Sequence, residues 1–104
     1  MNDIKLLGRL AQDPQMSQSA KGRAYVWFTV AVSRRNDKDN ADFIRCVAFD
    51  GQAEAISRYC AKGRQVLVEG RLQVSQSKDA KTGENRYHHT VVASSTHFLH
   101  DPSK

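Results

Sequence analysis

The chain has 104 residues, of which 39% are hydrophobic and 26% are charged, and its formal net charge is +5. This length and composition indicate one globular domain over residues 1–104 and exclude a largely disordered chain. The basic balance favours a polyanionic partner, and no apolar run approaches the ~20 residues that a membrane-spanning helix requires.

The first predicted strand covers residues 4–10, where apolar residues alternate with other side chains. This period of two is typical of a strand that buries one face. Leu7 is apolar on the face that should be exposed to water, so we expect it to contact a second subunit. Asp13 and Pro14 end the strand, and residues 15–22 are predicted to be a polar connection.

The second predicted strand covers residues 25–33. Val26 and Phe28 belong to its core face, so the alternation places Trp27 on the outer face. An indole left in water there is costly, and we expect Trp27 to contact either a nucleobase or a partner subunit. Residues 36–40 are predicted to form a charged loop, because they are rich in turn-forming residues.

The third predicted strand covers residues 42–49. Its outer face would carry Phe43, Arg45 and Phe49. A mixture of aromatic side chains and a cation is unusual for a core and typical of a surface on which bases stack. If the strand is out of register by one residue, both phenylalanines belong to the core instead.

A short helix is predicted after the third strand. Asp50 is expected to be its N-cap, and apolar residues at helical spacing continue it. Lys62 and Gly63 are predicted to form its last turn and its left-handed stop. The helix therefore lies between the third and the fourth predicted strands.

The fourth predicted strand covers residues 66–74. Gly70 interrupts its apolar face and predicts a bulge or a tight bend of the kind that closes a barrel. Residues 75–85 are predicted to form a hydrophilic hairpin loop. A fifth strand follows over residues 86–94, and residues 96–99 would extend it past a kink.

Five strands with one helix between the third and the fourth follow the element order of the OB-fold. We therefore predict an all-β domain with one helix, in which a five-stranded, closed or partly open barrel has the helix at one end. Barrels of this class bind nucleic acids or oligosaccharides across one face.

Short motifs stand in order along the chain: Gly8-Arg9-Leu10, Phe28-Thr29-Val30-Ala31-Val32, Ala41-Asp42-Phe43-Ile44-Arg45-Cys46-Val47, Val68-Glu69-Gly70-Arg71-Leu72-Gln73 and Phe98-Leu99. Together they resemble the bacterial single-stranded DNA-binding protein family, nearly from end to end and with the family's spacing. The resemblance implies a homo-oligomer, usually a tetramer of OB-folds, that coats single-stranded DNA in replication, recombination or repair.

The resemblance also implies that bases stack on aromatic side chains in a basic groove. Phe43 and Phe49 match two stacking positions of the family, and Lys62 matches a basic groove position. The arginines that we add to this set can also be read as ordinary solvated charges. The predicted nucleic-acid-binding residues are Trp27, Arg34, Arg35, Phe43, Arg45, Phe49, Lys62, Arg71 and Tyr87.

The chain departs from the family at two other stacking positions, which hold Asn36 and Ser77 here. Trp27 adds an aromatic side chain where the family more often has a polar residue. We therefore expect Trp27 to replace part of the stacking surface that is lost at the other two positions.

The expected partners are single-stranded DNA, further copies of the chain, and replication or recombination proteins. Leu7 and Ile44 are the predicted interface residues, because Ile44 lies in the family's interface region. Many relatives carry an acidic C-terminal tip that recruits partners, and residues 100–104 carry none, so we expect no binding to proteins that recognise it. The N-terminus lacks a secretion signal, which predicts a cytoplasmic protein. The family resemblance implies that it is associated with the nucleoid.

Two other classes of protein are disfavoured by the residue pattern. Nuclease chemistry would need clustered carboxylates, whereas those of this chain lie at the ends of separate elements. The histidines and the two cysteines lack the spacing of a structural zinc site, so we predict no metal, no cofactor and no catalysis.

A nearer alternative is an OB-fold primosome or DNA-uptake factor that loads another protein on single-stranded DNA. A cold-shock-like RNA-binding domain would need aromatic-rich motifs that are absent.

Overall fold

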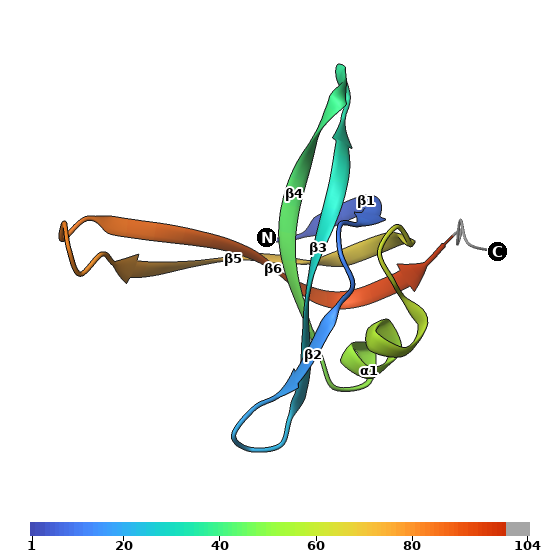
Figure 1. The fold of residues 1–104 in the computed structure, drawn as a ribbon, viewed down its shortest axis with the longest axis horizontal. Helices are drawn as coiled ribbons and strands as arrows, with labels where there is room; N and C mark the ends of the chain where they lie inside the picture. Colours follow the sequence, from blue (N-terminus) through green and yellow to red (C-terminus); the bar gives the residue numbers. More distant parts are fainter. Residues whose placement is uncertain (100–104) are drawn as a thin grey trace.

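The computed structural model describes residues 1–99, with Lys38 described only in its backbone (Figure 1). The chain is mainly β-structure with one helix. Its elements are β1 (Ile4–Leu10), β2 (Gln15–Gln18), β3 (Ala24–Arg34), β4 (Asp37–Phe49), α1 (Asp50–Tyr59), β5 (Gln65–Lys78) and β6 (Asn85–Phe98). The expectation about tail recognition concerns residues 100–104, which lie outside the described residues. No helix of the described residues is long and apolar enough to cross a membrane.

Five of the strands form a closed barrel. Their order is β1-β5-β6-β4-β3, and β3 pairs back with β1 through Leu10 and Val30. The pairings are antiparallel except between β4 and β6, which are parallel neighbours. The prediction of an all-β OB-fold barrel with one helix is confirmed.

The prediction that residues 15–22 are only a connection is wrong. Residues 15–18 form β2, which pairs with β3 from Gln15 opposite Trp27 to Gln18 opposite Ala24. All four residues of β2 are exposed, so no apolar alternation marks the strand in the sequence. Backbone pairing with the long β3 holds β2 in place. Because β2 is an additional strand, the helix α1 lies between β4 and β5, rather than between the third and fourth strands.

The barrel core follows the predicted alternation. Val26, Phe28 and Val30 of β3 are buried, as are Val66 and Val68 of β5. The helix adds two further buried residues to the same core, Ala53 and Ile56. The side chains between the buried strand positions are thereby turned outward, onto the surface that carries the candidate site.

The predicted helix ends are wrong. The N-cap residue is Phe49, which makes no side-chain cap hydrogen bond, and Asp50 is the first helical residue, with φ of 56°. The helix ends at Tyr59, because Cys60 adopts an extended conformation and buries its side chain. Gly63 is left-handed (φ 91°), but in the following loop, where its N–H donates to the carbonyl of Leu10.

The loops are shorter than the sequence predicts, and the strands beside them are longer. Residues 37–40 belong to β4, while residues 75–78 and 85 belong to β5 and β6. The β3/β4 and β5/β6 hairpins therefore extend well beyond the barrel (Figure 1). Polar composition hid these strands, because both faces of a projecting hairpin are exposed and no apolar alternation is needed. The predicted extension of the last strand is confirmed as far as Phe98.

Gly70 makes the bulge that the sequence predicts. The register between β5 and β6 shifts between Glu69 and Gly70. A Cβ at Gly70 would collide with the backbone oxygen of Val92 on the neighbouring strand. The glycine is therefore needed because two backbones approach closely where the barrel bends.

We expect Gly70→Ala to lower the free energy of unfolding by roughly 1–3 kcal/mol, the usual cost of overpacking a tight contact. Gly51→Ala is the matched control, since a Cβ there meets nothing within 4 Å. That change places alanine in a helix and should be neutral or stabilising. Urea unfolding followed by circular dichroism measures both. Equal stabilities of the Gly70→Ala and wild-type proteins would contradict the close approach.

Candidate nucleic-acid interface

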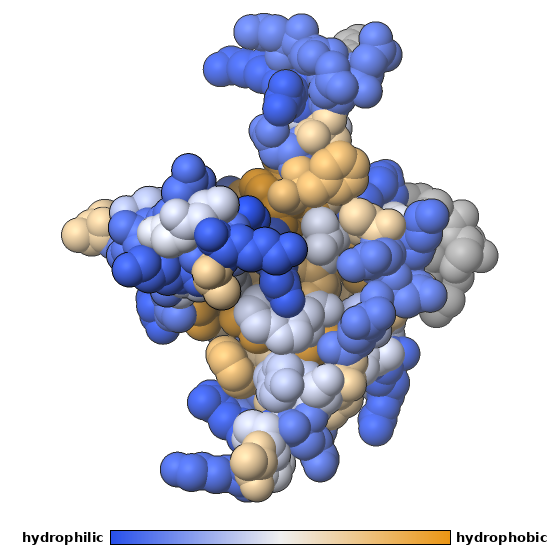
Figure 2. Space-filling model, turned by 60° about the vertical axis from the view of Figure 1, so that its left-hand side comes forward, coloured by the Kyte–Doolittle hydropathy of each residue, from blue (hydrophilic) through white to orange (hydrophobic). Residues whose placement is uncertain are grey.

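A groove of about 670 Å³ lies between the outer face of β3 and β4 and the base of the β5/β6 hairpin. We call the projecting part of this hairpin, residues 72–90, the arm. In Figure 2, apolar side chains are visible at the centre of one face of the molecule, surrounded by hydrophilic side chains. The groove is lined by Ser19, Arg23, Tyr25, Trp27, Val47, Phe49, Arg71, Gln73, Ser75, Thr90 and Val92.

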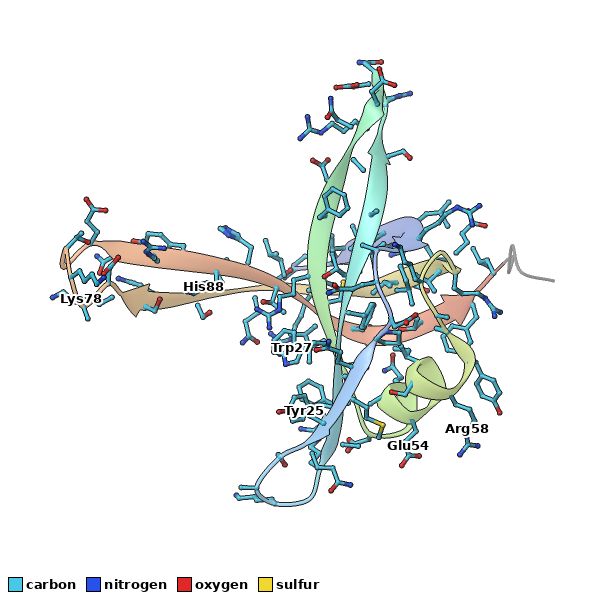
Figure 3. All side chains as sticks on the ribbon, in the orientation of Figure 1. Tyr25, Trp27, Glu54, Arg58, Lys78 and His88 are labelled. Atoms are coloured by element: carbon cyan, nitrogen blue, oxygen red, sulfur yellow. The ribbon has the colours of Figure 1, made fainter. Side chains whose placement is uncertain are left out.

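One wall of the groove comes from outward-facing residues of β3 and β4. Tyr25 pairs with Phe49 and Trp27 pairs with Val47 across the two strands. Figure 3 shows Tyr25 and Trp27 projecting from β3 on the side where the β5/β6 hairpin leaves the barrel. Since side chains alternate along each strand, the buried core positions of β3 and β4 fix these rings on the outer face.

The other wall comes from β5 and β6. Arg71 pairs with Val92, and Gln73 pairs with Thr90. Val92 also pairs with Val47 across the parallel contact between β6 and β4. Val47 is only 5% exposed although it lies outside the barrel core, so the bottom of the groove is apolar.

Arginine side chains stand over the rings beside the groove. The guanidinium of Arg23 lies 4.3 Å from the ring centre of Phe49, and that of Arg45 lies 4.1 Å from Trp27. Nε of Arg23 also donates to both carboxylate oxygens of Asp50, at 3.2 Å each. This surface combines flat π-faces with cations, the two features that single-stranded nucleic acids require of a non-specific site.

The structure brings three of the predicted binding residues into the groove: Trp27, Phe49 and Arg71. Arg45 lies beside them, against the ring of Trp27. Phe43 is on the same outer face of β4 and is 68% exposed, but it is six residues from Phe49, about 20 Å along an extended strand.

The other predicted binding residues are not among those that line the groove. Arg34 forms a 3.0 Å ion pair with Asp42, and Arg35 is exposed in the β3/β4 turn. The backbone N–H of Lys62 donates to Asp13 in the loop after the helix. Tyr87 pairs with Gln76, which alternation places on the side of the arm opposite to Ser75. Their contact with nucleic acid stays a prediction.

Several lining residues were missed by the sequence analysis. Tyr25 shares the outer face of β3 with Trp27, and the alternation alone could have identified it. Arg23 was assigned to no element, because it follows the predicted connection of residues 15–22 and the β2/β3 hairpin that positions it left no sequence signal. Gln73, Ser75 and Thr90 carry no charge or ring, and only the register of β5 against β6 brings them to the groove.

The two predicted interface residues lie on different sides of the barrel wall. Leu7 is 52% exposed on the outer face of β1. Ile44 is partly exposed and packs against the core cluster from the inner face of β4. Their contact with a second subunit stays a prediction.

The described residues contain no group of three or more histidine, cysteine or acidic side chains arranged to hold a metal ion. Cys46 and Cys60 are both buried, and neither is part of a disulfide. Burial raises the pKa of the Cys46 thiol to about 12, so this group stays protonated at neutral pH and packs as a small apolar side chain.

Comparison with known proteins connects this geometry to one family. The family model described as "Single-strand binding protein family" matches residues 1–99. The single-stranded DNA-binding protein of Clostridium perfringens is 43% identical over 100 residues, which cover 95% of this chain and 66% of that protein. The protein of the same name from Fusobacterium nucleatum is 42% identical over 104 residues, covering 94% of this chain and 66% of the relative.

A third relative, the single-stranded DNA-binding protein of Bacillus cereus, is 38% identical over 103 residues, covering 95% of this chain and 60% of the relative. The chain therefore spans about two thirds or less of the length of these three relatives.

Proposed function

The chain belongs to the single-strand binding protein family, and we propose that it binds single-stranded DNA, largely without sequence preference, in the groove described above. The observation that carries this proposal is the convergence of Tyr25, Trp27 and Phe49 with Arg71 around one groove. The names of the relatives support the same function, since each is a single-stranded DNA-binding protein.

Stacking on these rings explains the expected lack of sequence preference. Every base presents a π-face, and each base stacked on an aromatic side chain contributes ~1–3 kcal/mol to binding. In a duplex the bases already stack on one another, so the same rings favour a single strand. The polar side chains of Gln73, Ser75 and Thr90 line the opposite wall, where they can bond to base edges or phosphates.

We propose that the single-stranded DNA leaves the groove along β4. Phe43 lies on the same outer face, at a distance that several nucleotides would bridge, and its ring is mostly exposed. Arg35 lies in the turn beyond it and is also exposed, so it can meet the phosphate backbone. Arg34 is less suited to this role, because Asp42 already balances its charge.

The role that follows is coating and protecting single strands during replication, recombination or repair, as a binding protein rather than an enzyme. A protein with this role works in the cytoplasm, at the nucleoid. The primosome-type alternative is not favoured by any feature of the groove, and the names of the relatives describe DNA binding alone.

We also propose that the chain forms a homo-oligomer, with the tetramer expected from the family resemblance. Leu72, Val74 and Tyr87 are 36%, 52% and 60% exposed. They lie on the side of the hairpin opposite to the groove, and this side continues the core-facing side of the barrel wall beyond the barrel, because Leu72 pairs with the buried Val91. A second copy of the chain that packs against this face, or against Leu7 on β1, would remove the exposed apolar side chains from water.

The first prediction concerns salt and strand preference. The affinity for oligothymidine should fall linearly on a log–log plot against salt, with a slope of about −0.7 for each phosphate neutralised. Duplex of the same length should bind much more weakly, and single strands of different sequence should bind similarly. Filter binding or anisotropy across a salt series measures this. Equal affinity for duplex, or indifference to salt, would contradict the proposal.

The second prediction concerns Trp27, the only tryptophan of the chain. Saturating oligothymidine should quench its fluorescence, and Trp27→Ala should cost roughly 1–3 kcal/mol of binding without unfolding the barrel. Tyr59→Ala is the control, since Tyr59 is exposed on the helix and does not line the groove. Tight binding with unchanged emission, together with full affinity of the alanine variant, would remove Trp27 from the site.

The third prediction concerns assembly. Sedimentation at micromolar concentration should show an oligomer rather than a monomer of 11.7 kDa. Val74→Asp should weaken the assembly, because it places a charge on the apolar side of the arm. Ser77→Asp adds the same charge on the other side of the same strand and should leave the assembly intact. A wild-type protein that stays monomeric at micromolar concentration would contradict the proposed assembly.

A further inference from the structure

Arg45 contacts Trp27 from the neighbouring strand. Arg45 pairs with Thr29 across β3 and β4, while Trp27 pairs with Val47, so Arg45 and Trp27 are diagonal neighbours on the outer face. A long side chain can reach a diagonal neighbour in a sheet. The guanidinium carbon stands 4.1 Å from the centre of the indole, within the range of a cation–π contact.

The contact is on the side of Trp27 that faces away from the groove. Trp27 lines the groove and also a smaller cavity of about 160 Å³. Arg45 lines the smaller cavity, together with Gln12 and Gln15, and is not one of the residues that line the groove. Trp27 therefore lies between the two spaces, and the guanidinium over its ring belongs to the smaller cavity rather than to the groove.

We propose that Arg45 is a positioning residue for DNA binding. Its guanidinium packs against one face of the Trp27 indole and fixes the orientation of the ring, while a base stacks on the groove side of the indole. This inference rests on the proposed function, since it concerns how the same groove holds a base. The guanidinium, the indole and the base would form a three-layer stack in which only the base is exchanged. A ring already held in place loses less conformational freedom when the base arrives.

The contact of Arg23 with Phe49 differs from the contact of Arg45 with Trp27. Its guanidinium stands 4.3 Å from the ring centre of Phe49 and is anchored to Asp50, but Arg23 itself lines the groove. A base that approaches this face of Phe49 must displace Arg23 or stack over it. Arg45 does not line the groove, so it does not block the approach of a base to Trp27 from that side.

The competing interpretation is that Arg45 contacts a phosphate directly. The two roles respond differently to a loss of charge. A phosphate contact depends on the cation, so any neutral substitution should reduce the magnitude of the log–log salt slope by about 0.7. A supporting contact depends on what packs against the ring, so a neutral side chain that still packs there should preserve most of the affinity.

The test therefore compares Arg45→Ala with Arg45→Met in the full chain, using oligothymidine as the probe. Methionine is uncharged, but its long flexible thioether packs well against aromatic rings. We expect Arg45→Ala to weaken binding by about 2- to 30-fold, the range of a cation–π contact. Arg45→Met should recover much of that loss, and both variants should keep the wild-type salt slope. Arg45→Ala should also alter the Trp27 emission of the DNA-free protein.

Two further variants calibrate the measurement. Arg71→Gln removes a groove arginine that makes no ring contact among the described residues, and it should reduce the magnitude of the salt slope by about 0.7. Arg58→Gln, on the exposed face of the helix and away from the groove, should change neither affinity nor slope.

Equal losses in the Met and Ala variants, with the slope reduced by about 0.7, would overturn the inference and make Arg45 a phosphate contact. Unchanged emission of the DNA-free Arg45→Ala protein would overturn it as well. Failure of the wild-type protein to bind oligothymidine would instead overturn the proposed function, so the two failures are distinguishable.

Discussion

The parallel contact between β4 and β6 is the constraint on which the rest of the molecule depends. It consists of the pairs Cys46 with Val91 and Val47 with Val92. Cys46 and Val91 face inward and are completely buried in the core, whereas Val47 and Val92 face outward and form the bottom of the groove. One short seam therefore completes this part of the barrel and also joins the two walls of the groove.

The net charge of +5 comes from 16 lysines and arginines, and several of these arginines are already engaged within the protein. Arg23 and Arg34 are paired with acidic side chains, and Arg23 and Arg45 also lie against aromatic rings. These exposed ion pairs contribute little to stability, but they fix where the guanidinium groups stand. The groove thus depends on oriented rings at least as much as on free cations.

The sequence predicts the barrel well because alternation along β3, β4 and β5 decides which side chains are buried. The same rule placed Trp27 and Phe49 outside the core, and Gly70 marked the bulge that bends the barrel. The residue pattern and the family resemblance both indicated stacking on Phe49, whereas the position of Trp27 on the outer face was inferred from alternation alone.

Other features depend on contacts between distant segments and could not be predicted from local patterns. The groove wall formed by Gln73 and Thr90 depends on the register of β5 against β6. The helix start was misplaced because the Asp50 carboxylate bonds to Arg23 across the fold rather than capping its own helix. Lys62 and Tyr87 were assigned to the site from family position and composition, and neither lines the groove.

The measurement that tests this account most directly is an amide chemical-shift map of the protein titrated with oligothymidine. The account predicts that the shifts change most at Tyr25, Trp27, Val47 and Phe49 and at the base of β5 from Arg71 onward, with the helix unaffected. Binding accompanied by shift changes confined to the helix, to the loop that holds Lys62, or to the side of the arm opposite to the groove would contradict it.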